Sequence, residues 1–135
     1  MKNLPRLLAA IAFALSMTAC GGVDSPSSQT PVDFSGTLSP GGRQSTPFSV
    51  GKTGEMQLTL QTLNPRPVLG FLELAVGVPS GSDCAEIFGY IVAQAAVGQT
   101  YSFPQITKGS YCLLIADSGL VLTQPAAFNV HLLHP

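Results

Sequence analysis

The feature that most constrains this chain is an apolar residue at every second position, in short runs separated by turn-forming residues. The clearest run is residues 55–63, in which Met56, Leu58 and Leu60 fall on one side and polar residues on the other. Such alternation is typical of an antiparallel strand with one buried and one solvated face. We therefore expect layers of sheet with a core between them.

Eight segments with strand-like patterns lie along the chain. They are residues 32–38, 46–50, 55–63, 71–78, 86–93, 100–106, 110–117 and 127–134. Turn-forming clusters rich in Gly, Pro, Ser, Asp and Asn separate them at intervals of roughly ten residues, which predicts an all-β fold, an antiparallel β-sandwich of about eight strands over residues 33–135. Segment 86–93 is more apolar throughout than the other segments, so we expect either a strand covered on both sides or a β-bulge at Gly89.

The first nineteen residues carry the pattern of an export signal. Lys2 and Arg6 precede an apolar stretch at residues 7–17, and small residues follow it. This stretch is too short to cross a bilayer, which requires about 20 apolar residues. We therefore expect residues 1–19 to be a signal peptide that is removed on export.

The sequence MTAC, which ends at Cys20, resembles the lipobox of bacterial lipoproteins. That motif places an aliphatic residue and two small residues before an invariant Cys, and Met17 stands where the family usually has Leu. The resemblance implies that Cys20 begins the mature protein and carries acyl chains that anchor it in a membrane. Gly21, rather than Asp, follows the cysteine, and in this the chain resembles lipoproteins that are sent to the outer membrane. The expected location is therefore the bacterial cell envelope, in the outer membrane, with a periplasmic or secreted protein as the alternative.

Residues 20–32 connect the predicted signal peptide to the predicted strands. They are rich in Gly, Ser and Pro and have no apolar periodicity. This composition predicts a flexible tether with a root-mean-square reach of about 20 Å. A lipidated Cys20 at its start would hold the folded domain near a membrane without pressing the domain against it.

The number of cysteines supports the anchor independently. The chain contains three, Cys20, Cys84 and Cys112, and an odd number is unexpected in an exported protein, where thiols pair. If lipid takes Cys20, a disulfide between the other two would stabilise the domain by about 3.6 kcal/mol in the chain-entropy model. Two buried free thiols are the alternative, and metal ligation is disfavoured because neither a CxxC motif nor a histidine pair accompanies them.

Several stretches between residue 33 and residue 135 resemble the bacterial pre-peptidase C-terminal domain and small exported lipoproteins of similar plan. They are FSGTLSPGGRQSTPFSV, GEMQLTLQTL, KGSYCLLIADSG and AAFNVHL. The family has a polar turn after its first strand, then a Phe-containing strand, a Gly before an alternating strand, and a late Gly-x-Tyr. The resemblance implies a jelly-roll-like sandwich without catalytic residues. In that family the domain is usually appended to a secreted enzyme, which is not present in this chain.

Charge argues against nucleic acid as a partner. The net charge is −1, and no cluster of Lys or Arg occurs after the first six residues. The chain therefore lacks the basic footprint that binding to phosphate backbones requires.

The titratable residues favour structural roles. His131 and His134 are three apart on one predicted strand, which places them on opposite faces and disfavours a shared metal, with His131 at the surface. Asp117 and Asp83 are expected to form turns through their side chains, Asp83 just before Cys84. No GxSxG elbow marks a serine as a nucleophile, although a catalytic triad assembled without such a motif stays open. We therefore predict no catalytic residue, no metal and no cofactor.

Tyrosines supply the candidates for a ligand site. Tyr90 and Tyr101 could line a shallow groove, and core packing is the alternative interpretation. Tyr111 and Cys112 are neighbours on one predicted strand and should face opposite ways. We expect Tyr111 to point into the core and Cys112 to reach toward Cys84.

Together these features predict a non-catalytic envelope lipoprotein whose β-sandwich serves binding or structural association. Its expected partners are the membrane, through the lipid anchor, and an envelope protein or a glycan. A carbohydrate-binding module and a small secreted hydrolase are the alternatives. An exposed aromatic strip would favour the first alternative, and a polar pocket would favour the second.

Overall fold

The computed structural model describes residues 28–135, so the predicted signal peptide, Cys20 and most of the predicted tether lie outside the described part of the chain. The elements are β1 (Thr30–Leu38), β2 (Arg43–Val50), β3 (Gly54–Asn64), β4 (Leu72–Ser80), β5 (Asp83–Ala95), β6 (Thr100–Ile106), β7 (Gly109–Ala116) and β8 (Ala126–His134). No helix among residues 28–135 has the length and apolar character needed to cross a membrane. The predicted all-β fold of eight strands is confirmed.

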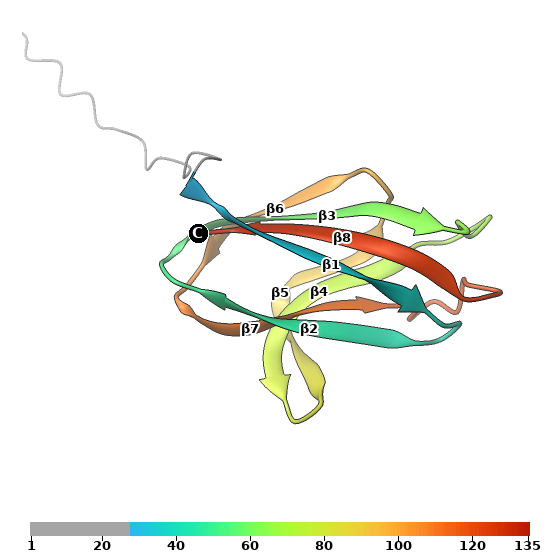
Figure 1. Cartoon of the computed structure of the whole chain (residues 1–135), viewed down its shortest axis with the longest axis horizontal. Helices are drawn as coiled ribbons and strands as arrows, with labels where there is room; N and C mark the ends of the chain where they lie inside the picture. The colour runs from blue at the N-terminus through green and yellow to red at the C-terminus, as the bar shows by residue number, and fades with distance from the viewer. Residues whose placement is uncertain (1–27) are drawn as a thin grey trace, which may run out of the picture.

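The strands form two antiparallel four-stranded sheets packed face to face (Figure 1). The first sheet has the order β1-β8-β3-β6 and the second has the order β2-β7-β4-β5. Most successive strands belong to different sheets, so the chain winds around the core in the manner of a jelly roll. This is the topology that the family resemblance implied.

The alternating pattern in the sequence places the core between the sheets. Met56, Leu58 and Leu60 of β3 are fully buried there. Across from them, Tyr111 and Leu113 of β7 belong to the same cluster. Because successive residues of a strand face opposite ways, these positions fill one core while their neighbours face outward. The predicted inward orientation of Tyr111 is confirmed.

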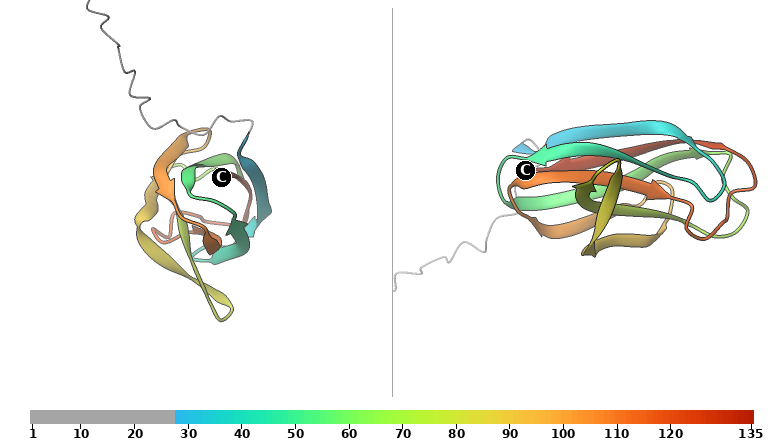
Figure 2. Two further views of the ribbon diagram at one scale, coloured as in Figure 1. Left: turned by 90° about the vertical axis from the view of Figure 1, so that its left-hand side faces the viewer. Right: turned by 90° about the horizontal axis from the view of Figure 1, so that it is seen from below.

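A second, smaller apolar cluster lies on the other side of β7. It consists of Ala75, Cys84, Cys112 and Leu114. Cys84 and Cys112 form a disulfide, with their Cα atoms 5.8 Å apart. The bond fixes the β4–β5 hairpin over the outer face of the second sheet, and Figure 2 shows this hairpin projecting from the sandwich. The predicted pairing of the two cysteines is confirmed.

Strand β5 carries the predicted bulge. Ala75 pairs with Ile91, whereas Gly77 pairs with Glu86, so four residues of β5 lie opposite a single residue of β4. Gly89, inside the bulge, has φ of 95°, a conformation that Gly adopts without steric cost. The bulge interrupts an edge strand of the second sheet.

The edge strands of both sheets carry features that hinder pairing with another chain. Pro31 lies on β1, Pro47 on β2 and Pro104 on β6, while β5 carries its bulge. Proline cannot donate a backbone hydrogen bond, and a bulge breaks the regular ladder, so both make an edge strand less able to pair with another chain. Association along the sheet edges is therefore disfavoured. The ends of the sandwich do not have this restriction on contact with other molecules.

The two ends of the sandwich differ in what they carry. Thr30 pairs with His134, so the first strand begins beside the end of the last strand. We call this end the tether pole, and the C-terminus is marked there in Figure 1. Four loops make up the opposite end, which we call the far pole: residues 39–42, 65–71, 96–99 and 117–125.

Candidate functional site

Exposed apolar side chains gather at the far pole. Val68 is 97% exposed, Leu69 83% and Leu120 76%, and Phe71 is also exposed. The first two and Phe71 belong to the loop of residues 65–71, and Leu120 belongs to the neighbouring loop. Single exposed apolar residues are common on proteins, but a group of them at one place marks a surface for contact.

The sequence of the 65–71 loop explains why its tip is held outward. Pro65 and Pro67 restrict the backbone on either side of Arg66. Gly70, with φ of 92°, ends the loop in a conformation that favours glycine. A Cβ atom at Gly70 would lie 2.3 Å from Cγ1 of Val121, so the two loops approach this closely only because the residue is glycine.

Asp117 fixes the second loop from within. Its side chain accepts backbone hydrogen bonds from Gly41 at 2.9 Å, Val121 at 2.7 Å and Leu122 at 3.2 Å, and the residue is buried. The bonds join the turn at residues 39–42 to the loop at residues 117–125. The predicted role of Asp117 as a turn-forming side chain is confirmed.

Leu120 adopts an unfavourable backbone conformation at the surface. Its φ is 52°, in the left-handed region, and its N–H donates to the carbonyl of Asp117 at 3.2 Å. Among the described residues it is the sole non-glycine residue with positive φ. A side chain in this region costs about 1–2 kcal/mol, and Gly or Asn is the usual occupant. Residues with such strain cluster at functional sites, so Leu120 is a candidate for a role in binding.

Shallow grooves flank the 65–71 loop. One, of about 370 Å³, lies between this loop and Val121 and Thr123. The other, of about 230 Å³, lies between this loop and Ala96 and Val97. Arg66 borders both grooves, is exposed, and makes no ion pair with any of residues 28–135. The far pole thus combines exposed apolar side chains with one unpaired cation, Arg66.

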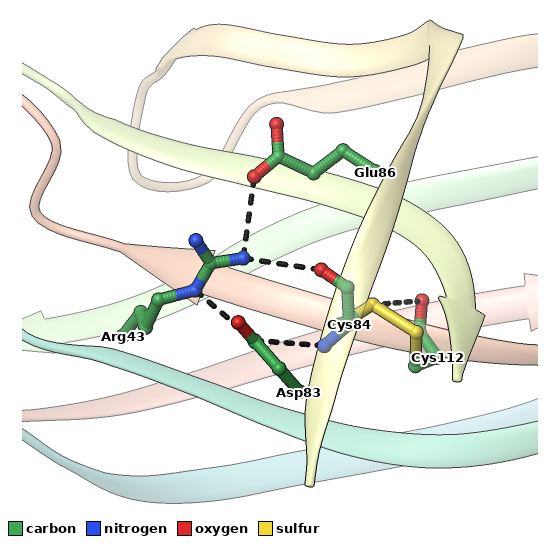
Figure 3. A network of polar contacts seen from close by, with 5 residues as sticks. All are labelled: Arg43, Asp83, Cys84, Glu86 and Cys112. Atoms are coloured by element: carbon green, nitrogen blue, oxygen red, sulfur yellow. Dashed lines mark hydrogen bonds and ion pairs between the residues drawn. A yellow bond between two sulfur atoms is a disulfide. The ribbon is translucent and has the colours of Figure 1, made fainter. Parts of the chain in front are cut away.

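A polar network binds the β4–β5 hairpin to β2 (Figure 3). The guanidinium of Arg43 lies 3.4 Å from both the Asp83 and Glu86 carboxylates, and it donates to the Cys84 carbonyl at 3.1 Å. Asp83 also accepts from the N–H of the adjacent Cys84 at 2.7 Å. This bond lies within β5 and does not span the turn at residues 81 and 82, so the turn role of Asp83 stays a prediction. Arg43 and Asp83 are about half exposed, and such ion pairs contribute little stability. This pairing was not predictable from the sequence, because it depends on how the hairpin folds over β2.

Tyr90 and Tyr101 lie where the edges of the two sheets meet. The Tyr90 hydroxyl donates to the carbonyl of Gln105, from β5 to β6. The Tyr101 hydroxyl donates to the carbonyl of Gln94 at 3.1 Å and accepts from the N–H of Ala96 at 2.8 Å. Both hydroxyls therefore bind backbone across the sandwich. This is the packing role that the sequence left open as the alternative to a ligand groove.

The histidines lie on opposite faces of β8, as predicted. His131 Nδ1 lies 2.7 Å from Asp33 Oδ1 on the outer face of the first sheet. His134 is buried, with its ring centroid 5.3 Å from that of Phe48. Within residues 28–135, no group of three or more His, Cys, Asp or Glu side chains could hold a metal ion. The His131–Asp33 pair was missed because it depends on the register of β1 against β8.

No family model matches this chain, and no curated protein matches it. The role of the domain is therefore inferred from its own surface. The exposed apolar side chains of the far pole form a group that points to contact with another molecule. A polar hollow of about 480 Å³ lies elsewhere, beside Arg43, Ser82 and Asp83.

Proposed function

We propose that this protein is a non-catalytic lipoprotein of the bacterial cell envelope whose β-sandwich binds a partner through the far pole. Support for the anchor comes from the sequence: a signal-like segment, the lipobox-like MTAC ending at Cys20, and a Gly/Ser/Pro-rich tether. The disulfide between Cys84 and Cys112 uses the other two cysteines, which leaves Cys20 for lipid. The proposed location is the outer membrane.

The single observation that carries the binding role is the gathering of exposed apolar side chains at one end of the domain. Four of the seven large apolar side chains that are exposed among the described residues lie there, namely Val68, Leu69, Phe71 and Leu120. Exposed apolar surface is unfavourable in water, and it is retained where a partner covers it. The left-handed conformation of Leu120 also supports the binding role, because it lowers the free energy of unfolding to keep a leucine at this surface.

The placement of the chain ends fits the same proposal. The tether would join the sandwich where β1 begins, at the tether pole, because Thr30 lies beside His134 there. The far pole lies at the other end of the strands, away from the attachment point. An anchor at one end and a contact surface at the other let the domain hold a partner without releasing the membrane.

The carbohydrate alternative has less support. Sugar-binding grooves use exposed aromatic faces, but the hydroxyls of Tyr90 and Tyr101 are bonded to backbone between the sheets. Phe88 is the most exposed aromatic residue of the described chain, and it lies on the β5 bulge two positions from Tyr90. The Tyr90 ring packs against Phe103, with centroids 5.5 Å apart, and its hydroxyl binds the carbonyl of Gln105, so its face is less available to a glycan.

Photo-crosslinking in intact cells tests the proposed function. A photoreactive amino acid replaces Leu69 in one variant and Phe88 in a matched control, since both side chains are highly exposed. We expect a discrete crosslinked product from position 69 and none from position 88. The binding role of the far pole is wrong if position 69 gives neither a protein adduct nor a lipid adduct, or if position 88 gives the same product in equal yield.

A further inference from the structure

We infer that the partner of the far pole is the surface of a phospholipid bilayer. Val68, Leu69 and Leu120 enter the acyl region, and Arg66 binds lipid phosphates above them. This inference rests on the proposed function, because it names the class of partner for the same surface. It adds a second membrane contact to the one that the lipid on Cys20 provides.

The shape of the far pole favours lipid. Val68 and Leu69 stand almost free of protein neighbours at the tip of one loop, and Leu120 does so on the next loop. Protruding side chains of this kind require matching pockets in a protein partner. Fluid acyl chains close around any protruding apolar shape, so a bilayer accepts them without a prepared site.

Charge at the far pole also matches a phospholipid surface. In residues 28–135 the acidic residues outnumber the basic residues by six to four. The far-pole loops nevertheless contain a single acid, Asp117, which is buried and bonded to backbone N–H groups. Arg66 is their single basic residue. An arginine beside apolar tips can keep its guanidinium at the phosphate level while its stem lies along apolar surface.

Contacts within the far pole fix the conformations of the loops at residues 65–71 and 117–125 before any insertion. Asp117 ties the loop that carries Leu120 to Gly41, and Gly70 lets the other loop pack against Val121. Side chains on fixed loops lose little conformational freedom when they enter a bilayer. Few inserted side chains therefore suffice for a useful affinity.

The predicted tether is long enough for the far pole to reach the anchoring bilayer. The nine residues of β1 span about 30 Å between the poles. Residues 21–29, when extended, also span about 30 Å. The domain can therefore turn over and place its far pole on the membrane that holds Cys20.

Tryptophan fluorescence tests insertion directly, because the chain contains no tryptophan. Leu69→Trp places the sole reporter at the far pole, and Phe88→Trp places it at an equally open position on the β5 bulge. The mature chain from residue 20 is used with Cys20→Ser, since residues 28–135 already enclose their own core. Each variant is mixed with phosphatidylglycerol–phosphatidylcholine vesicles. We expect the Leu69→Trp emission to move to shorter wavelength and the Phe88→Trp emission to stay unchanged.

Loss variants measure the contribution of the tips in the Leu69→Trp background. Val68→Ser with Leu120→Ser should weaken vesicle binding by about tenfold or more, because two apolar side chains no longer enter the bilayer. Arg66→Gln should reduce the preference for vesicles rich in phosphatidylglycerol over phosphatidylcholine alone. Thermal unfolding of each variant verifies that the domain stays folded.

The outcomes separate the lipid inference from the proposed function. No emission shift for Leu69→Trp, or an equal shift for Phe88→Trp, overturns the lipid inference. If the crosslinker at position 69 still captures a discrete protein in cells, the far pole binds protein and the proposed function stands. If both experiments are negative, both proposals are wrong.

Discussion

The carboxylate of Asp117 accepts a hydrogen bond at 2.9 Å from the backbone N–H of Gly41, although the two residues lie 76 positions apart in the chain. The same carboxylate accepts from Val121 and Leu122, so one buried side chain organises two loops of the far pole. Leu120 lies between these bonded residues and remains exposed. At the far pole, a buried polar side chain, Asp117, thus holds the loops that expose the apolar side chains.

Removing the Asp117 carboxylate should destabilise the domain. Asp117→Ala leaves three backbone N–H groups without their acceptor, and we expect the free energy of unfolding to fall by at least about 3 kcal/mol. Asp117→Asn keeps one oxygen as acceptor and should lose less. Urea denaturation of both variants measures the difference. A loss below about 1 kcal/mol for the alanine variant would show that these bonds do not hold the loops.

Leu120 should show a conflict between stability and binding. Asparagine tolerates positive φ better than leucine, so Leu120→Asn should raise the free energy of unfolding by about 0.5–1 kcal/mol. The same change should weaken the vesicle response of Leu69→Trp, because it removes one apolar tip. Leu120→Val is the matched control, expected to destabilise because β-branched residues tolerate this region least. A stabilised Leu120→Asn that binds as well as the parent would remove the binding argument from this residue.

The disulfide should contribute stability without affecting the far pole. It closes a loop between residues 28 apart in sequence, and the double variant Cys84→Ala with Cys112→Ala should lose about 3–4 kcal/mol of unfolding free energy. Vesicle binding should be unchanged, since the bond lies on the outer face of the second sheet. Denaturation and the tryptophan assay measure the two effects separately. Reduced vesicle binding by the folded double variant would link the hairpin to the far pole, contrary to this expectation.

The fold was predictable because its determinants are local. Met56, Leu58 and Leu60 alternate with polar residues, so their strand and its buried face follow from period two alone. The pairing of Cys84 with Cys112 followed from export and an odd number of cysteines. The jelly-roll order came from the family resemblance, since alternation does not specify which strands become neighbours.

The far pole was not predicted, because its character depends on two loops meeting in space. Residues 65–71 contain turn-forming Pro and Gly, and these predict a turn without indicating whether Val68 and Leu69 are buried or exposed. An apolar pair between a proline and a glycine inside a turn was the available signal. The conformation of Leu120 had no sequence signal, because leucine seldom occupies the left-handed region.

Cys20 provides the test of the anchor. Cys20→Ser removes the thiol that would carry the diacylglycerol, so metabolic labelling of the protein with a radioactive or clickable fatty acid should be lost. The Cys84→Ala, Cys112→Ala double variant is the control and should be labelled like the parent. Labelling that persists in Cys20→Ser would contradict the lipoprotein assignment and favour plain secretion.

The central claim is that the far pole is covered by another molecule in the cell, and cysteine accessibility measures this most directly. Leu69→Cys adds one thiol to a chain whose Cys84 and Cys112 are paired and whose Cys20 is proposed to be acylated. Phe88→Cys is the control at a similarly exposed site. A small maleimide should modify both thiols rapidly in the purified unlipidated domain. In intact cells we predict that Cys at position 69 is protected while Cys at position 88 reacts, and equal, rapid modification of both positions would contradict the account.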